Sequence, residues 1–580
     1  MSNNLEKLYS CNNIFSLVKI FHYEFNMSAK EFWDIIYSKN HYSSYISKKI
    51  PKANGSEREL LIPPKPVKDL QKKFAIILSD CLFEIRKKNP NYLVCNHAFE
   101  KKKSIITNAK LHRNKNYVLN IDLSDFFGSI HYGRIYSFLK KDTHFKLNDK
   151  IAKIIAQISC YRDPYNKTFL PQGSPLSPVI ASLIGNLLDI QLIKIAKKYK
   201  LTYSRYADDL TFSSNMPIPK DLIYWNEHLS TWKTGYLLQQ IVHNAGFKIN
   251  EQKTRLFSSR QQQTVTGIVV NRNLNVNNIY QKNNRAMLHN LYTHGEFFIG
   301  KNQGTIDQLI GRLNHVVMVK YLEQHPSYTN EEWDKAKKEL IKTCSQFDNK
   351  IESNRSIRLL RQAIFYKYFI SLNKTIIFPE GFTDSMYFRL ANKIRNKENK
   401  DNYIFQNLNT SLAFIGLGGG TNPIQTFLSG AYEKYMINTS KLKIKSNYPA
   451  IFILDYDEGL ENFGKYIQLF KNDEQWKHIK ENLYVVLLCP LKKNGKSFSY
   501  KNKTDMVCIE NLLSSSAGVD IVIDSEDHNK IKFGKKQWSK VQFANLVANK
   551  SRLFDFKKFD KIFEILKEIE QHYKDKIVIK

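Results

Sequence analysis

Tyr206-Ala207-Asp208-Asp209 is the stretch from which the fold of this chain can be worked out. Apolar β-forming residues flank it, Leu201 and Tyr203 before it and Leu210 and Phe212 after it, so we predict a hairpin with two acids at its turn. Adjacent carboxylates repel each other, and a divalent cation relieves the repulsion because hard cations such as Mg²⁺ bind carboxylate and phosphate oxygens. A solvated Asp-Asp turn without a ligand is the alternative, and the rest of the sequence decides between the two.

A second acid lies upstream, at the end of another β-type run. The run from Tyr117 to Leu123 contains Asp122 near its end, which is a common way for a strand to present a metal ligand. Between the two acidic sites, Pro171-Gln172-Gly173 forms a turn that opens a helix, and the glycine lets a nucleotide approach the backbone closely. Two metal ions about 4 Å apart can activate a hydroxyl and stabilise a leaving pyrophosphate. Carboxylates on two adjacent strands would suit such a pair of ions.

The composition points to a polyanionic partner. The chain of 580 residues has a formal charge of +34, enough length for two to four domains and enough apolar residues for packed cores. Residues 1–370 carry +25 of this charge and residues 371–580 carry +9, so the first part binds the polyanion more heavily. Seven cysteines stand without any CxxC pair, and neither a signal pattern nor an uninterrupted apolar run of about 18 residues is found. We expect a cytoplasmic protein without a membrane partner.

The order of these motifs resembles the fingers and palm of reverse transcriptases. Asp122 matches motif A, Pro171-Gln172-Gly173 motif B and Tyr206-Ala207-Asp208-Asp209 motif C, while Gly246-Phe247-Lys248-Ile249-Asn250 with Lys253 matches motif D. The resemblance implies dNTP substrates and Mg²⁺, with Asp122, Leu123, Asp208 and Asp209 as the metal set. It also implies that Phe127 excludes the ribonucleotide 2′-hydroxyl. The residues expected to bind the nucleotide are Arg58, Lys52, Phe127, Gln172, Gly173 and Lys253, the first two from a basic hairpin around an Asn-Gly turn.

Two shorter signatures narrow the resemblance to retron reverse transcriptases. Asn108-Ala109-Lys110-Leu111-His112 fits an NAxxH pattern before motif A, and Val265-Thr266-Gly267 fits a VTG pattern after motif D. Taken alone, a histidine near a loop is usually a surface or structural residue. In that family both signatures serve recognition of a dedicated structured RNA, which implies RNA binding by Asn108, Ala109, His112, Val265, Thr266 and Gly267. The enzymes copy part of that RNA into branched RNA-linked DNA, called msDNA.

The C-terminal part shows a second set of acids at strand ends. Apolar runs at 375–378, 412–415, 450–454 and 483–488 alternate with helical segments, which predicts a parallel α/β sheet. Glu380 follows the first run, and Asp455 and Asp457 follow the third, so we expect all three in one crevice at the carboxyl edge of the sheet. Three converging carboxylates would repel unless they bind Mg²⁺ or Mn²⁺. Helix-capping acids beside a glycine-rich turn are the alternative.

This arrangement resembles the toprim domain, whose marks are Glu-Gly after one strand and DxD after a later one. Ile509-Glu510-Asn511 resembles a later motif of nucleases of the overcoming-lysogenisation-defect type, which makes Glu510 a further metal ligand and Lys540 a support for the scissile phosphate. The sequence departs from many relatives at Glu458-Gly459, which leaves the particular toprim chemistry undetermined. About 210 residues are short for a topoisomerase, and no candidate nucleophilic tyrosine stands out, so a nuclease fits best.

We therefore expect a right-hand polymerase of the α+β class followed by an α/β toprim domain with a parallel sheet. The expected domains are fingers and palm in 1–275, a helical thumb in 276–370 and a toprim nuclease in 371–580. By resemblance, the nuclease would be a toxic effector in antiphage defence that cuts DNA or RNA, tRNA included. The expected partners are the cognate RNA and its msDNA product. A homo-oligomer held together by msDNA is an alternative that the sequence does not decide. A non-catalytic toprim scaffold and a group II intron-like reverse transcriptase are the alternatives.

Overall fold

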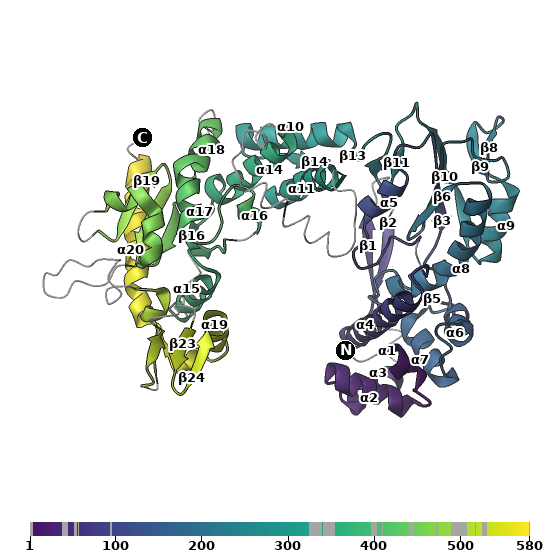
Figure 1. The fold of residues 1–580 in the computed structure, drawn as a ribbon, viewed down its shortest axis with the longest axis horizontal. Helices are drawn as coiled ribbons and strands as arrows, with labels where there is room; N and C mark the ends of the chain where they lie inside the picture. The colour runs from purple at the N-terminus through teal and green to yellow at the C-terminus, as the bar shows by residue number, and fades with distance from the viewer. Residues whose placement is uncertain are drawn as a thin grey trace. The chain divides into compact units, whose positions relative to one another are not determined.

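The computed structural model describes residues 4–37, 45–51, 55, 57–92, 95–323, 339, 354–395, 403–408, 410–439, 446–470, 474–488, 507–516, 518–524 and 530–578. These residues form two compact units (Figure 1), the first made mainly of Met1–Asn277 and the second mainly of residues from Asn278 onward. Each unit is built around sheets and helices of its own and is described separately.

An antiparallel four-stranded sheet forms the centre of the first unit. Its strand order is β10-β3-β7-β6, and the predicted hairpin at 206–209 is confirmed as the β6–β7 connection. Strand β3 pairs with β7 on one side and β10 on the other, so the Asp122 strand is adjacent to the hairpin. The strands are β3 (Tyr117–Ser124), β6 (Thr202–Tyr206), β7 (Asp209–Ser214) and β10 (Lys248–Ser258).

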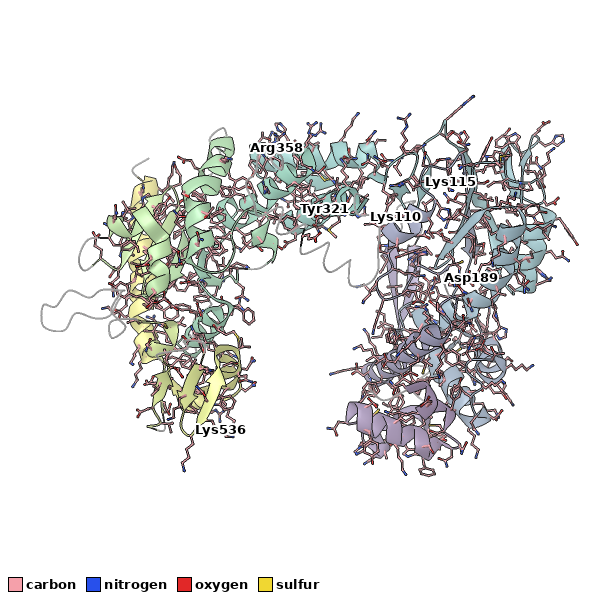
Figure 2. All side chains as sticks on the ribbon, viewed as in Figure 1. Lys110, Lys115, Asp189, Tyr321, Arg358 and Lys536 are labelled. Carbon is pink, nitrogen blue, oxygen red and sulfur yellow. The ribbon has the colours of Figure 1, made fainter. Side chains whose placement is uncertain are left out.

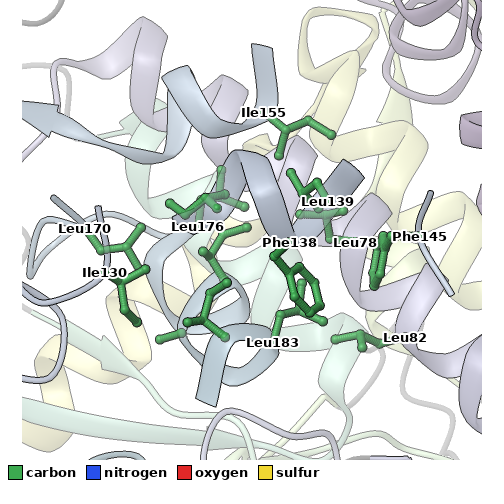
Figure 3. Packing of buried hydrophobic residues seen from close by; sticks show 14 of the residues in the cluster. Leu78, Leu82, Ile130, Phe138, Leu139, Phe145, Ile155, Leu170, Leu176 and Leu183 are labelled. Atoms are coloured by element: carbon green, nitrogen blue, oxygen red, sulfur yellow. The ribbon is translucent and has the colours of Figure 1, made fainter. Parts of the chain in front are cut away.

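Helices with apolar faces pack against this palm sheet and against one another, and together they build the core of the first unit. Leu78, Leu139, Ile155 and Leu183, from α4, α6, α7 and α8, are among the buried side chains that interlock there (Figure 3). By length and composition α8 could cross a membrane, but 67% of its most apolar window is buried in this core, as expected of a core helix. The helices are α1 (Asn4–Tyr9), α2 (Ile14–Phe25), α3 (Ala29–Tyr37), α4 (Lys65–Lys88), α5 (Ile105–Leu111), α6 (Tyr132–Lys141), α7 (Asp149–Ser159), α8 (Ser177–Lys198) and α9 (Tyr236–Asn244).

Short antiparallel pairs surround the palm sheet. The basic hairpin expected near residues 48–58 is present as β1–β2, with Ile50 opposite Arg58. The remaining short strands pair as β4–β5 and β8–β9, and β11, β12 and β13 form a three-stranded sheet. The strands are β1 (Ile46–Pro51), β2 (Glu57–Ile62), β4 (Tyr161–Arg162), β5 (Thr168–Phe169), β8 (Ile223–Asn226), β9 (Thr231–Thr234), β11 (Thr264–Val265), β12 (Ile268–Val269) and β13 (Asn275–Val276).

The second unit begins with helices in the range 278–370, where a thumb is expected from the sequence. Leu288, Leu309 and Ile364 from these helices belong to the same buried cluster as Phe378 and Phe452 of the following sheet. Because thumb and sheet share one core, the segment between them is packed, in agreement with the absence of a Gly/Ser linker. The elements are α10 (Asn278–His294), β14 (Phe298–Ile299), β15 (Asn302–Gln303), α11 (Ile306–Glu323), α14 (Arg355–Phe365) and the π-helix η1 (Tyr366–Ile370).

A five-stranded, mostly parallel sheet follows, in the order β17-β16-β18-β20-β19. Three of its four pairings are parallel as predicted, whereas the edge strand β19 runs antiparallel to β20. The strands are β16 (Thr375–Pro379), β17 (Tyr403–Phe405), β18 (Ala450–Leu454), β19 (Trp476–Lys480) and β20 (Leu483–Leu487).

The predicted strand at 412–415 is wrong. Residues Thr410–Ala413 form the short helix α16, and the strand that pairs with β16 at that edge is β17 instead. Leu412 and Ile415 are fully buried, and a short apolar run cannot by itself distinguish a buried strand from a buried helical turn.

Helices and a small antiparallel sheet complete the second unit. Helices α15 and α19 pack against each other beside the sheet. The helices are α15 (Phe382–Arg395), α17 (Thr421–Thr426), η2 (Phe427–Ala431), α18 (Tyr432–Thr439), η3 (Glu458–Leu469), η4 (Ile509–Leu512), α19 (Lys540–Asn549), η5 (Ser551–Leu553), η6 (Lys557–Phe559) and α20 (Asp560–Val578). The short strands are β21 (Ser514–Ser515), β22 (Ile521–Ile523), β23 (Lys530–Phe533), β24 (Lys536–Ser539) and β25 (Phe554–Asp555).

Candidate active sites

Three carboxylates meet at one end of the palm sheet. Asp209 is the first residue of β7 and is directly opposite Asp122 of β3 in the strand register. The backbone N–H of Leu123 donates to the carbonyl of Asp208 over 3.0 Å, which continues this pairing into the turn. Ala207 adopts a left-handed conformation with φ +57°, so that the chain reverses tightly just before the two acids. The structure thus brings the motif A and motif C acids to the same edge.

The apposition of these acids makes Asp208 and Asp209 hard to ionise. Burial and the charge of Asp122 raise the pKa of Asp208. Although Asp209 keeps exposed surface, desolvation, followed by the charges of Asp208 and Asp122, raises its pKa to about 7. A cation among the three carboxylates would offset this repulsion, so the residues present fit a divalent metal. The side chain of Leu123 is buried, which leaves only its backbone carbonyl as a ligand.

A cleft of about 650 Å³ opens above these acids and gathers the residues expected to bind the nucleotide. The backbone N–H of Leu61 in β2 donates to the carbonyl of Gln172 over 2.7 Å, so the β1–β2 hairpin is tied to the motif B turn. Gly173 has φ +128°, and a Cβ at this position would lie 2.7 Å from the Leu61 carbonyl oxygen, so only glycine fits there. The lining includes Arg58, Phe99, Asp122, Leu123, Phe127, Gln172, Asp208 and Lys253. Lys52 lies outside the described residues.

Strand β10 contributes two polar contacts to the motif A acid. Lys253 Nζ donates to Asp122 Oδ1 over 2.9 Å, and Asn250 Nδ2 donates to Asp122 Oδ2 over 3.1 Å. The Lys253 side chain is 63% exposed, so it can leave this ion pair at little cost. Motif D is thereby placed beside motif A, with a mobile positive charge at the cleft.

The ring of Phe127 is half-buried at the cleft and is braced by other rings. It contacts Phe126 at a centroid distance of 5.5 Å and Phe99 at 6.3 Å. We expect Phe127→Ala to reduce the preference for dNTP over rNTP roughly 10- to 200-fold, the range that one apolar group in a pocket contributes. The measurement is kcat/KM for a matched dNTP and rNTP pair.

Phe127→Tyr is the matched control for this substitution, because it keeps the ring. Its selectivity should stay close to that of the wild type. Unchanged sugar discrimination in Phe127→Ala would show that another group forms the steric gate.

A buried ion pair behind the catalytic turn was not found from the sequence. Arg205, next to the turn, is 1% exposed and donates through Nε and Nη2 to Asp189 of α8, labelled in Figure 2, at 2.8–3.1 Å. Arg205 Nη1 also donates to the carbonyl of Ala207 over 3.2 Å, at the residue with positive φ. The helix that begins after motif B is thereby connected to the motif C turn. A lone Arg and a lone Asp separated by 15 other residues give no local signal of such a pair.

Gly185 provides the space for this guanidinium. A Cβ at position 185 would lie 2.7 Å from Arg205 Cζ, and the buried ion pair prevents the side chain from moving aside cheaply. We expect Gly185→Ala to lower kcat of DNA synthesis roughly tenfold or more with little change in KM for dNTP, because small misplacements of catalytic groups cost rate. Steady-state kinetics give the split between kcat and KM.

Gly311→Ala is the matched control, since it adds the same methyl group to a helix where a Cβ meets nothing within 4 Å. Wild-type kinetics are expected there. An equal fall of activity in both variants, or a rise of KM alone in Gly185→Ala, would argue against the positioning role of Arg205.

The two retron-type signatures lie against each other, but most of their side chains are buried. Helix α5 contacts β11 and β12, and Thr266 Oγ1 donates to the carbonyl of Ile105 over 3.2 Å. Ala109 and Val265 are 0% exposed, and Thr266 and Gly267 form the β11–β12 turn with φ +47° and +81°. In the turn, Gly267 is exposed and Thr266 is partly exposed.

The polar residues of the NAxxH signature are bonded within the palm. Asn108 and His112 are both 0% exposed. Ser204 Oγ donates to Asn108 Oδ1 over 2.6 Å, and the two ring nitrogens of His112 lie 2.7 Å from Ser213 Oγ and Ser204 Oγ. Burial lowers the pKa of His112 to about 3, so the ring is neutral. In this conformation these side chains do not reach RNA, and the expected direct contact is revised to positioning of α5 on the palm strands.

The second set of acids collects at the carboxyl edge of the mostly parallel sheet. Glu380 directly follows β16, and Asp455 directly follows the neighbouring strand β18. The Asp455 N–H points at Glu380 Oε2 at 3.4 Å, and Asp457 Oδ1 accepts from the Gly459 N–H over 2.8 Å. Burial, followed by the charge of Asp457, raises the pKa of Glu380 to about 7. The three predicted acids therefore share one place, as the strand pattern indicated.

Asp384 belongs to this cluster and was missed from the sequence. Its side chain is 6% exposed and accepts from the Gly381 N–H over 2.7 Å. Burial, followed by the charges of Asp384 and Glu510, raises the pKa of Asp455. The signal was available, because Asp384 stands four residues after Glu380, in the first turn of the helix α15 that follows the β16 edge.

Glu510 and Lys540 complete the cluster. Glu510 is fully buried, and neither of its carboxylate oxygens has a hydrogen-bond partner. Lys540 Nζ lies 3.7 Å from Glu510 Oε2. Burial alone would lower the pKa of Lys540, but the charges of Glu510 and Asp455 raise it above its ordinary value. A buried carboxylate without hydrogen bonds is costly, and a bound cation would compensate it, so this site also fits a divalent metal.

Comparison with known proteins identifies the first unit. Residues 50–270 match the family described as reverse transcriptase (RNA-dependent DNA polymerase). The chain is 33% identical over 222 residues to the retron Ec86 reverse transcriptase of Escherichia coli, a match that covers 38% of this chain and 61% of that protein. It is 31% identical to the retron Mx162 reverse transcriptase of Myxococcus xanthus, covering 39% and 47%, and 32% identical to the retron Ec73 reverse transcriptase of Escherichia coli, covering 38% and 67%.

The sequence matches cover only part of this chain and only part of each relative. The chain spans about half to two thirds of the length of these curated relatives. Among solved structures, telomerase from Candida albicans in complex with a fragment of telomeric RNA is similar with a TM-score of 0.29 and 11% identity, covering 61% of this chain and 68% of that one. On the sequence relationships, the chain belongs to the retron reverse transcriptases.

Proposed function

We propose that the first unit is an RNA-directed DNA polymerase. The observation that carries this proposal is the meeting of Asp122, Asp208 and Asp209 beneath a cleft of about 650 Å³. Divalent metal ions, when bound by these acids, would activate the primer hydroxyl and stabilise the leaving pyrophosphate. The chain's own residues bind and orient the substrates.

The residues around the cleft suggest separate tasks in nucleotide binding. Arg58 on the β1–β2 hairpin presents a guanidinium suited to the triphosphate. The Gln172-Gly173 turn would approach the base and sugar, and Phe127, which lines the cleft, would limit the space at the 2′-position. Lys253 now donates to Asp122, and it would be free to neutralise phosphate charge if a cation bound that carboxylate instead.

We further propose that the template is a dedicated structured RNA and that the product is msDNA. Membership in the retron family and the excess positive charge of residues 1–370 support this. Through the buried Asn108 and His112, helix α5 is fixed against β6 and β7, which leaves the exposed parts of α5 and the 266–267 turn to meet RNA.

Sequencing of the nucleic acid that co-purifies with the protein tests this template assignment. Branched RNA-linked DNA is the expected result. Linear cDNA of unrelated transcripts would contradict it and would favour an intron-like enzyme. In the described residues and the sequence we find no pattern of an HNH endonuclease or maturase extension.

For the second unit we propose a metal-dependent nuclease of the toprim type, acting as the toxic effector of an antiphage system. The cluster of Glu380, Asp384, Asp455, Asp457 and Glu510 supports this, because packing does not require five acids at one sheet edge. A bound divalent ion would activate water for phosphodiester hydrolysis. Lys540 is placed to neutralise charge on a phosphate at the cluster.

The substrate of this nuclease would be DNA or RNA. In the cytoplasm, the polymerase with its RNA and msDNA would keep the nuclease inactive until a phage interferes with that complex. A toprim scaffold that binds nucleic acid without cutting is the second candidate for this unit. Neither the family match over residues 50–270 nor the retron relatives assign the C-terminal fold. Cleavage assays separate the two candidates.

A further inference from the structure

A cysteine sulfur lies inside the acidic cluster of the second unit. Cys508 Sγ and one carboxylate oxygen each of Asp455 and Asp457 all lie within 4.8 Å of one another. Within the described part of the chain, this is the one group of three His, Cys, Asp or Glu side chains with such metal-ligand spacing. Cys508 is 5% exposed, so its sulfur, which lies against the two aspartates, has little contact with solvent.

The backbone fixes the place of this sulfur. Tyr456, between the two aspartates, exchanges both backbone hydrogen bonds with Val507, at 2.9 and 3.0 Å. The Ile509 N–H donates to Asp455 Oδ1 over 3.1 Å. Cys508 is therefore held from both sides against the Asp455–Asp457 segment, and its approach does not depend on a flexible surface rotamer.

A second observation points to a cation at this place. Glu510, two residues after Cys508, is 0% exposed and neither carboxylate oxygen has a hydrogen-bond partner. Its nearest compensating charge is Lys540 Nζ at 3.7 Å, longer than a hydrogen bond. Buried carboxylates in this state are stabilised when a metal ion enters among them.

We propose that this cluster selects a thiolate-binding transition-metal ion, such as Co²⁺ or Zn²⁺, with the Cys508 thiolate as a ligand beside Asp455 and Asp457. The inference rests on the proposed metal-dependent role of the cluster and adds the identity of the metal. Mg²⁺ takes oxygen ligands, whereas a soft thiolate favours the transition metals. On binding, the thiol proton is released to solvent, and the thiolate forms the metal–sulfur bond.

Titration of the full-length protein with Co²⁺ tests this, because a cobalt–thiolate bond gives a sulfur-to-metal charge-transfer absorption that oxygen ligands do not give. We expect the wild type to develop this band and Cys508→Ser to lose it, with Co²⁺ affinity reduced roughly tenfold or more. Serine is close in size and keeps the N-cap acceptor of η4, so the fold should be retained. Cys95→Ser, in the first unit, is the matched control and should keep the band.

The outcomes separate this inference from the proposed nuclease. A band of full size in Cys508→Ser, or Mg²⁺ displacing Co²⁺ as readily as Zn²⁺ does, would overturn the thiolate assignment. Mg²⁺-dependent cleavage without any band in the wild type would leave the nuclease standing and remove Cys508 from the site. A Cys508-dependent band without cleavage of any nucleic acid would support the metal site and reject the nuclease.

Discussion

Asp208→Asn is expected to abolish DNA synthesis, lowering kcat roughly 10³-fold or more. Metal ions contribute several kcal/mol to such reactions, and each 1.36 kcal/mol corresponds to a factor of ten in rate. Asparagine keeps the volume of the side chain and its place in the turn, so binding of the cognate RNA should be retained. Primer extension with the purified variant gives the rate, and retention of RNA in the same preparation shows that the fold is intact.

Stability gives an independent reading of the same site. The folded-state pKa of Asp209, about 7, lies above its ordinary value of 3.8, and the pKa of Asp208 is also raised. Metal-free protein therefore loses stability as pH rises from about 4 through about 7, because ionisation is more costly in the folded state than in the unfolded chain. D208N should melt no lower than the wild type in EDTA at pH 8, while Mg²⁺ should raise Tm less in the variant.

Wild-type synthesis rates in D208N would refute the metal role of the turn. A variant that melts well below the wild type without metal would show instead that Asp208 stabilises the fold. Its loss of activity would then not be evidence that Asp208 binds a catalytic metal. Asp163→Asn, in the β4–β5 turn away from the acids, serves as the control substitution.

Asp455→Asn should remove nucleic-acid cleavage by the second unit, again roughly 10³-fold or more if the acids hold the reacting metal. Asp455 is 8% exposed, and burial with the charges of Asp384, Glu510 and Glu380 raises its pKa, so the neutral amide relieves repulsion without creating a cavity. DNA synthesis by the first unit should be unaffected. The measurement is metal-dependent degradation of labelled DNA and RNA, together with growth of cells that express each variant.

The control for this experiment is Asp520→Asn, which removes an exposed acid of the same unit outside the cluster. It should cleave as the wild type does. If the folded wild-type protein cuts neither polymer with Mg²⁺, Mn²⁺ or Co²⁺, the acids are not a nuclease site and the scaffold function is favoured.

Local patterns sufficed for much of this protein. The acids of motifs A and C and the strand-end acids Glu380 and Asp455 could be placed because each lies at one end of a short run of β-type residues. The glycine of motif B could be placed because its turn precedes a helix. Apolar residues recur every two residues in a strand and every three to four residues in a helix. Because these patterns involve residues close together in the sequence, hairpins, helices and their ends can be predicted without tertiary information. The order of those elements then indicated the family.

Contacts between distant residues were beyond such patterns. The sequence could not show that 412–415 forms no strand, that β19 joins the sheet antiparallel, or that Asn108 and His112 are buried. Arg205 meets Asp189, and Cys508 meets Asp455, only because separate elements pack together. The amino-acid sequence by itself indicated which residues are candidates for the chemistry and on which kind of element they lie. Tertiary packing decided their partners and their burial, because desolvation and ion pairing depend on neighbours that lie far apart along the chain.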